Sequence, residues 1–160
     1  MRRTSNFSVR ARSLAIVLLA FVAATWASPV LAQLQGGSVY PIDGVQNPPV
    51  SFQSIGTAVT YMVANGVTGS GQVVLELNSG YAGETSSVTI PPITGTNAAL
   101  GVTFRPASGY SAQTITAGAA SPNQFAVRIT GSYITLDGQA GGGGGGRNWL
   151  IRCTGPGSSG

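Results

Sequence analysis

From residue 72 onward the chain alternates apolar and polar residues over short stretches that are bounded by Gly, Pro, Asn or Ser. This period of two is typical of strands buried on one face, because successive side chains of a strand point to opposite sides. The 24 glycines and nine prolines among 160 residues indicate many turns between short elements. The sequence therefore predicts an all-β protein. Its expected strands lie near residues 72–78, 88–90, 102–105, 114–116, 127–130, 134–137 and 149–153.

The predicted strands form two interleaved series of apolar residues. Leu77, Phe104, Ile129 and Ile151 are separated by 27, 25 and 22 residues, and Ile90, Ile115 and Leu136 by 25 and 21. A pair of strands recurring once per coil suits a parallel β-solenoid, in which each inward side chain stacks on its equivalent about 4.8 Å further along. We expect residues 67–160 to form the first, N-terminal coils of such a β-helix, with the glycines of 141–146 in a variable loop. An antiparallel β-sandwich is the alternative, because it also has short strands at turn-marked intervals.

One short helix is predicted over residues 51–66. Its mediocre helix propensity means that it must dock its apolar stripe, and the open end of the first coil is the expected surface. We therefore expect a capping helix, preceded by a flexible, turn-rich entry segment over residues 33–50. The helix is predicted from Ser51 as N-cap, Phe52, Ile55, Val59, Met62 and Val63 at helical spacing, and Asn65-Gly66 at its end.

The first 32 residues have the three parts of a secretion signal. Four arginines precede an apolar run over residues 14–27, and Val30-Leu31-Ala32 offers the small residues of a cleavage site. The run is shorter than the roughly 20 residues of a membrane span, although an uncleaved anchor stays open. We expect an exported bacterial protein that is secreted or on the cell surface, starts at Gln33, and has no stable membrane span after cleavage.

The charge and the reactive residues exclude several kinds of function. The four arginines after the signal balance four carboxylates, so the processed chain is formally neutral and no nucleic-acid partner is expected. The absence of histidine excludes His-based triads and His metal sites. The single cysteine, Cys153, excludes an internal disulfide. We expect it to pack inward beside Trp149 and Ile151 as a small apolar residue, and the alternative is a free thiol that joins two chains.

Two stretches carry a resemblance to a known family. "SFQSIGTAVTYMVANGV" followed by "GQVVLELNSGYAGET" resembles the start of right-handed parallel β-helix proteins with a pectin-lyase-like fold. Those proteins often open with an apolar helix, a strand and a Gly-Tyr turn. "FAVRITGSYITLDGQAGGGGGGRNWLIRCTG" is similar to the paired-strand repeat of the same family. The resemblance covers roughly residues 51–155. It implies the N-terminal fragment of a secreted or cell-surface β-helix protein.

Active members of this family use acidic clusters with Arg or Lys on one outer face, to bind calcium or to abstract a proton. Glycosidases need two or three carboxylates close together. The repeat region has one carboxylate, Asp137, and Asp137-Gly138 is more simply a strand-ending turn. Arg105 and Glu84 are expected to be solvated edge and loop residues. The sequence thus predicts no catalytic group, cofactor or metal site.

A ligand-binding face is the remaining expectation. Tyr133 could stack on a sugar ring, although tyrosine also simply favours strands. Outward threonines are expected beside it at positions 103, 114, 116, 130 and 135. The candidate ligand-face residues are Tyr133, Arg128, Asp137 and Arg152.

These observations predict a non-catalytic scaffold that binds a polysaccharide or a cell-surface partner. The alternative is the N-terminal part of a polysaccharide lyase or glycoside hydrolase whose active site lies in further coils, and a non-functional remnant is a third possibility. Self-association through open strand edges is also expected.

Overall fold

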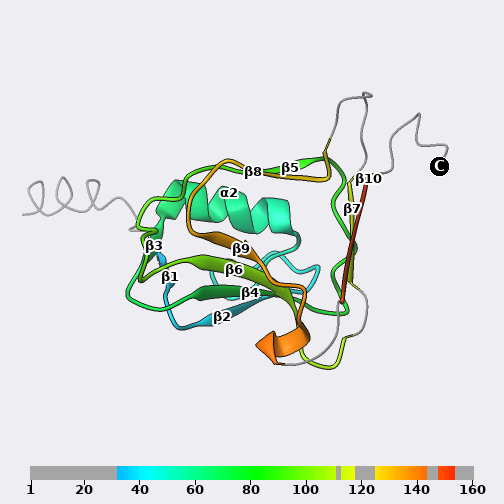
Figure 1. The fold of residues 1–160 in the computed structure, drawn as a ribbon, viewed down its shortest axis with the longest axis horizontal. Coiled ribbons are helices and arrows are strands. Elements are labelled where there is room, and N and C mark those ends of the chain that lie inside the picture. The colour runs from blue at the N-terminus through cyan, green and yellow to red at the C-terminus, as the bar shows by residue number, and fades with distance from the viewer. Residues whose placement is uncertain (1–31, 111–112, 118–124, 144–147, 154–160) are drawn as a thin grey trace, which may run out of the picture. The chain divides into compact units, whose positions relative to one another are not determined.

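The computed structural model describes residues 32–110, 113–117, 125–143 and 148–153. Within these ranges the chain consists mostly of strands with little helix, so the predicted all-β class is confirmed (Figure 1). No helix of the described part is long and apolar enough to cross a membrane. The elements are β1 (Leu34–Gln35), β2 (Val39–Ile42), α2 (Ile55–Asn65), β3 (Val67–Thr68), β4 (Val73–Leu77), β5 (Val88–Ile90), β6 (Val102–Pro106), β7 (Gln113–Ala117), β8 (Val127–Ile129), β9 (Ile134–Leu136), the 3-10 turn η1 (Ala140–Gly142) and β10 (Trp149–Cys153).

Every ladder between these strands is parallel. The largest sheet has the order β2-β4-β6-β9, and three two-stranded sheets pair β1 with β3, β5 with β8, and β7 with β10 (Figure 1). Leu75 lies opposite Phe104, and Phe104 lies opposite Leu136. The antiparallel pairing of a β-sandwich therefore does not occur in these ladders.

Each predicted strand is present, but the predicted pairing into two series is wrong. Ile129 pairs with Ile90 rather than with Phe104, and Ile151 pairs with Ile115. Leu136 belongs to the ladder of Phe104 instead of that of Ile115. The seven predicted strands thus fall into three sheets instead of two series, because the alternation of side chains shows which face is buried but not which strand lies alongside. Of the predicted glycine loop, residues 144–146 lie outside the described part.

The entry segment predicted over residues 33–50 contains two strands. β2 is an edge strand of the largest sheet, and Leu34 and Ile42 are completely buried. Pro41 lies within β2 and lacks an N–H group. A proline is compatible with an edge strand, and on the side of β2 away from β4 the Pro41 carbonyl accepts from the N–H of Phe52 without needing a donor of its own. The many turn residues around Val39–Ile42 concealed this strand in the sequence.

The helix begins at Ile55, four residues after the predicted N-cap, Ser51. Ser51 is part of a β-bridge, and Ser54 is the N-cap instead. The N–H of Thr57 donates to the Ser54 hydroxyl over 3.2 Å, and the N–H of Ser54 donates to the Thr57 hydroxyl over 3.0 Å. This reciprocal pair is a capping box. Gly66, with a φ of 76°, ends the helix as predicted.

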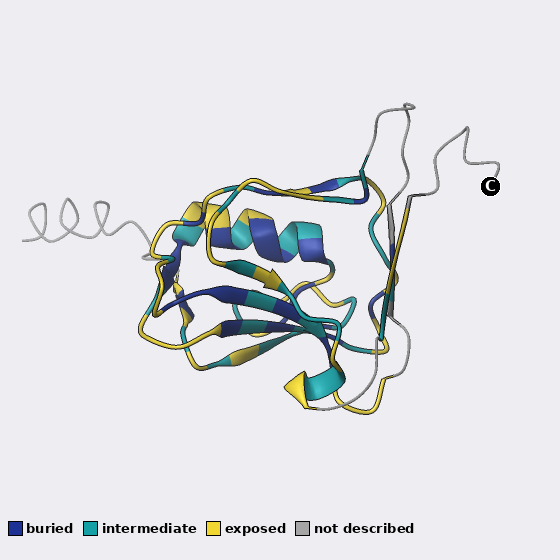
Figure 2. Cartoon of the chain, viewed as in Figure 1, coloured by how far each residue is buried: buried dark blue, intermediate teal, exposed yellow. Residues whose placement is uncertain are grey.

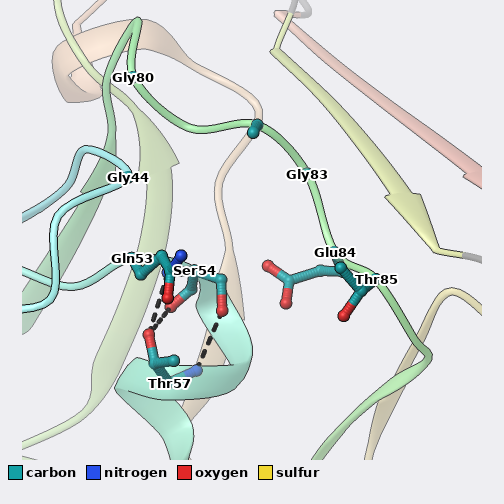
Figure 3. A pocket seen from close by; sticks show the side chains of 9 residues that line it. Gly44, Gln53, Ser54, Thr57, Gly80, Gly83, Glu84 and Thr85 are labelled. Carbon is teal, nitrogen blue, oxygen red and sulfur yellow. Dashed lines mark hydrogen bonds between the residues drawn. The ribbon is translucent and has the colours of Figure 1, made fainter.

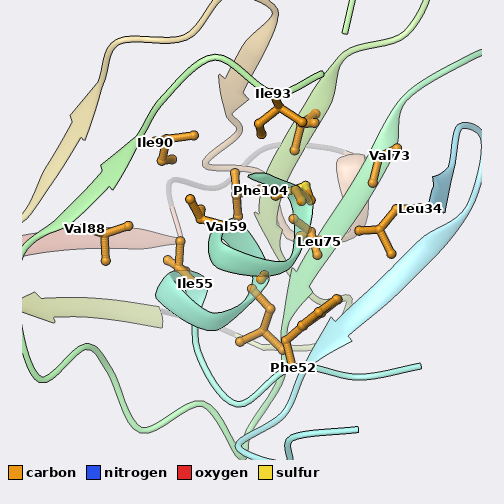
Figure 4. Packing of buried hydrophobic residues seen from close by; sticks show 14 of the residues in the cluster. Leu34, Phe52, Ile55, Val59, Val73, Leu75, Val88, Ile90, Ile93 and Phe104 are labelled. Atoms are coloured by element: carbon orange, nitrogen blue, oxygen red, sulfur yellow. The ribbon is translucent and has the colours of Figure 1, made fainter. Parts of the chain in front are cut away.

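The apolar stripe of α2 packs on the inward side chains of the strands (Figures 2 and 4). Val63 was predicted to join this stripe, but its side chain is 47% exposed. α2 packs beside β5, whose other edge pairs with β8. Along β4 and β6, buried and partly exposed residues alternate, as a strand with one buried face requires. The largest fully buried side chains are Phe52, Phe104, Leu34, Ile42, Ile55, Met62, Leu75, Leu77, Ile90 and Ile115.

Gly95 marks a turn where two backbones approach closely. Its φ is 97°, and a Cβ at this position would overlap the carbonyl oxygen of Val67. Gly109 also has a positive φ, 84°, but nothing lies within 4 Å of its Cβ position. We expect Gly95→Ala to lower the free energy of unfolding by about 1–2 kcal/mol more than Gly109→Ala, because both alanines bear the dihedral strain and only the first has the overlap. Urea titration of both variants measures this difference, and equal losses would contradict the close approach.

Candidate functional site

The outward side chains of the largest sheet form the candidate site. The inward positions of β4, β6 and β9 are apolar, so strand alternation places the polar residues of these strands on the other side, together with Val74. Glu76 lies opposite Arg105 in the register, and Thr103 lies opposite Thr135. We define the polar face as Gln72, Glu76, Thr103, Arg105, Tyr133 and Thr135.

Glu76 and Arg105 form an ion pair across β4 and β6. Nε and Nη2 of Arg105 donate to Oε1 of Glu76 over 2.8 and 2.6 Å, and only 20% and 19% of the two side chains are exposed. Arg105 is therefore not the solvated edge residue that the sequence predicted. The guanidinium also lies close to Gly142 of η1, where a Cβ would overlap Nη1. The strand register was the missing information, because nothing else in the sequence aligns Glu76 with Arg105.

The threonine row continues the polar face toward β9. The hydroxyl of Thr103 donates to Oε1 of Gln72 over 3.1 Å. Thr135, its neighbour in the register, is exposed. Two hydroxyls and an amide thus lie beside a charge-matched pair. Such a surface offers hydrogen-bond donors and acceptors without a net charge.

Tyr133 stands immediately before β9 in an unusual backbone conformation. Its φ is 61°, and its side chain is 52% exposed. Its carbonyl oxygen accepts a hydrogen bond of 2.9 Å from the N–H of Val102, which ties the residue to β6. A bulky side chain rarely adopts a positive φ. The surrounding ladder holds Tyr133 in this strained state with its ring in solvent.

The other predicted ligand-face residues do not share this site. Asp137 follows β9, and its Oδ1 accepts from the N–H of Gln139 over 2.9 Å, as expected of a turn residue. Arg128 lies on β8 with its guanidinium 5.7 Å from the ring centre of Phe125. Arg152 is exposed on β10. The four residues are thus divided among three sheets. The side chain of Cys153, predicted to point inward, lies outside the described part.

A pocket of about 390 Å³ lies at the N-terminus of α2 (Figure 3). The carboxylate of Glu84 enters it and accepts from the N–H groups of Ile55 and Gly56 over 2.7 and 3.1 Å. These are free donors of a first helical turn, where a negative charge is also favoured by the helix dipole. Glu84 already occupies the place that an anionic ligand would take. The hydrogen bonds of Glu84 thus connect the loop after β4 to the start of α2, and we call this connection the Glu84 joint.

Tyr81 completes this joint. Its hydroxyl donates to Oε1 of Glu84 over 2.9 Å. Burial raises the pKa of Tyr81 well above its ordinary value, and the charge of Glu84 and this hydrogen bond raise the pKa further. The phenol therefore keeps its proton and continues to donate. Sequence reasoning placed Glu84 in a solvated loop, because it reaches a helix 28 residues away in the sequence.

All four carboxylates of the described residues have structural partners. Oδ1 of Asp43 accepts from the N–H of Val45 over 3.0 Å, and the partners of Glu76, Glu84 and Asp137 are given above. No group of three or more potential metal ligands occurs in the described ranges. The carboxylates thus hold turns, a helix end and an arginine in place. None is arranged as the opposed pair that glycoside hydrolysis uses.

Comparisons with models of known protein families, with characterised proteins and with solved structures find no match to this chain. The geometry of the polar face is therefore the basis on which a function is assigned.

Proposed function

We propose that the chain is an exported, non-catalytic right-handed parallel β-helix whose polar face binds a neutral polysaccharide. Three observations support the fold. All described ladders are parallel, and the chain runs β6, β7, β8 and then returns to the same sheets with β9 and β10. Parallel crossovers are almost always right-handed. α2 packs beside β5, where the strand of a preceding coil would lie, so it acts as the N-terminal cap.

The observation that carries the binding function is Tyr133. A strained residue that its surroundings hold in place is a marker of a functional site. The exposed ring can cover the apolar face of a sugar, while its hydroxyl stays in water. Thr103 and Thr135 lie on the adjacent strands and supply hydroxyls at the spacing of neighbouring strands, about 4.8 Å.

The charges on this face favour a neutral ligand. Arg105 is matched by Glu76 through two short hydrogen bonds, so neither charge is available to a uronate carboxylate without breaking the pair. Catalysis is not part of the proposal, because Glu76 is held by Arg105 and the remaining carboxylates hold the backbone. The signal sequence over residues 1–32 supports export, where polysaccharides are accessible.

Affinity electrophoresis through gels containing neutral polysaccharides tests this proposal. The chain is purified from the periplasm of an export host, and its start is read by mass spectrometry, with Gln33 expected. We expect migration to be retarded in at least one neutral gel. Tyr133→Ala is expected to weaken retention by about two- to twelvefold, since stacking on an aromatic ring contributes about 0.5–1.5 kcal/mol.

Tyr110→Ala is the matched control, because Tyr110 is also an exposed tyrosine but lies in the turn after β6. It should leave retention unchanged. If both variants lost retention equally, the ligand would not bind at Tyr133. An absence of retention in all neutral gels, together with binding to a protein partner, would replace the polysaccharide by a cell-surface partner as the ligand of the scaffold.

A further inference from the structure

The expected signal cleavage site lies where the folded part of the chain begins. The signal sequence is expected to end at Ala32, and the compact unit of the structure starts at this same residue. Ala32 and Gln33 are exposed, whereas Leu34, the first residue of β1, is completely buried. Once the signal has been removed, Gln33 alone precedes the buried start of β1.

The strand that follows Gln33 is fixed to the rest of the fold. Leu34 lies opposite Val67 in the parallel ladder of β1 with β3. The N–H of Gln35 donates to the hydroxyl of Tyr40 over 2.8 Å. The first residue of the processed chain can therefore react or turn without disturbing the strand behind it.

The side chain of Gln33 lies at the surface beside the end of α2. A Cβ at Gly66 would lie 3.3 Å from Nε2 of Gln33, so the amide rests beside a residue that has no side chain. Before cleavage, the hydroxyl of Tyr61 on α2 donates to the carbonyl oxygen of Ala32. Cleavage after Ala32 removes this hydrogen bond and converts the nitrogen of Gln33 into a free α-amine.

We propose that Gln33 becomes a pyroglutamyl residue after signal cleavage, by closure of its α-amine on its own side-chain amide. The amine nitrogen attacks Cδ, a new N–Cδ bond closes a five-membered lactam, and the Cδ–Nε2 bond breaks. Nε2 leaves as ammonia with one proton from the amine, so no oxidant, reductant or second reactant is needed. Every ring atom belongs to Gln33, so β1 keeps its place. This inference rests on the export part of the proposed function and is independent of the polysaccharide.

The reaction is favoured because the two groups belong to one residue, so that closure is intramolecular. The pKa of an α-amine lies close to neutrality, and a substantial fraction is therefore uncharged and nucleophilic at neutral pH. The negative end of the α2 dipole near Gly66 favours the charged ammonium, which slows closure by less than about sixfold. The lactam has no charge and no free amine, so it closes the start of the chain to aminopeptidases.

Intact mass spectrometry of the exported chain tests the modification. After several days at neutral pH, we expect a chain that begins at Gln33 and is lighter by one ammonia molecule. Edman degradation of this chain should give no sequence. The native chain and the chain unfolded in guanidinium chloride should close at rates within about sixfold of each other, because the structure leaves Gln33 free to react. A native chain that stays open while the unfolded chain closes would overturn the proposal.

Gln33→Glu is the matched control, since it keeps the shape of the side chain but replaces the amide by a carboxylate that an amine does not attack at neutral pH. It should keep its open-chain mass, and a loss of ammonia from this variant would overturn the assignment to Gln33. A wild-type chain that begins at Gln33 and keeps its ammonia would overturn the modification alone. A chain that begins at another residue would overturn the expected cleavage site together with the modification, and neither result depends on polysaccharide binding.

Discussion

Phe104→Ala is expected to lower the free energy of unfolding by about 3–5 kcal/mol, the largest effect of any single substitution considered for this chain. Phe104 is completely buried at the centre of β6, with Leu75 and Leu136 opposite it on the two neighbouring strands. Truncation removes the ring's burial and leaves a cavity between two ladder partners that cannot both move inward. Since small domains are stable by only about 5–15 kcal/mol, the variant should be partly unfolded at mild urea concentrations.

Urea titration followed by circular dichroism measures this loss. Phe104→Leu should lower the free energy of unfolding by less than Phe104→Ala, because most of the side-chain volume is retained. Val39→Ala is the matched surface control on the same sheet, and it should change stability by less than about 0.5 kcal/mol. If Phe104→Ala proved as mild as Val39→Ala, the inward face assigned to β6 would be incorrect.

Glu84→Ala is expected to lower the free energy of unfolding by about 2–3 kcal/mol. The substitution removes the acceptor of the first two N–H groups of α2 and of the Tyr81 hydroxyl. Stability falls when partly buried N–H groups lose a charged acceptor, and the helix end also loses a favourable negative charge. Hydrogen exchange at Ile55 and Gly56 should accelerate more than exchange in the sheet, because the opening is local.

Two comparisons separate the capping role from a general surface effect. Glu84→Gln keeps an acceptor oxygen but loses the charge, so its free energy of unfolding should lie between those of the wild type and of Glu84→Ala. Thr85→Ala changes an exposed neighbour and should have little effect. Unchanged exchange at Ile55 in Glu84→Ala would show that Glu84 does not hold the helix.

The strand positions could be predicted from the sequence because alternation is a local property. Val73, Leu75 and Leu77 are buried, with Val74 and Glu76 between them, as the period of two requires. The end of the helix at Gly66 was equally local, because the conformation that ends a helix there suits glycine. By contrast, β2 was missed, because Pro41 and the surrounding turns mask a strand that pairs with the distant β4 and with Phe52.

The site could be predicted only in part, for the same reason. Tyr133 was a candidate because an outward aromatic ring can stack on a sugar, but its strained φ was not visible in the sequence. The Glu76–Arg105 pair and the Glu84 joint connect residues 28 or 29 positions apart, and the spacing of residues along the chain does not indicate which of them meet.

The sequence by itself determined the β class, the places of most strands, the buried face of β4, β5 and β6, and most of the apolar stripe of the helix. All of these depend on neighbours within a few residues. Only the tertiary structure decided that the described strands stack in four sheets, with Ile129 on Ile90 and Ile151 on Ile115. It also decided that the last row of side chains remains partly exposed. Register depends on the length and path of the intervening turns, and a period of two is satisfied equally well by many pairings.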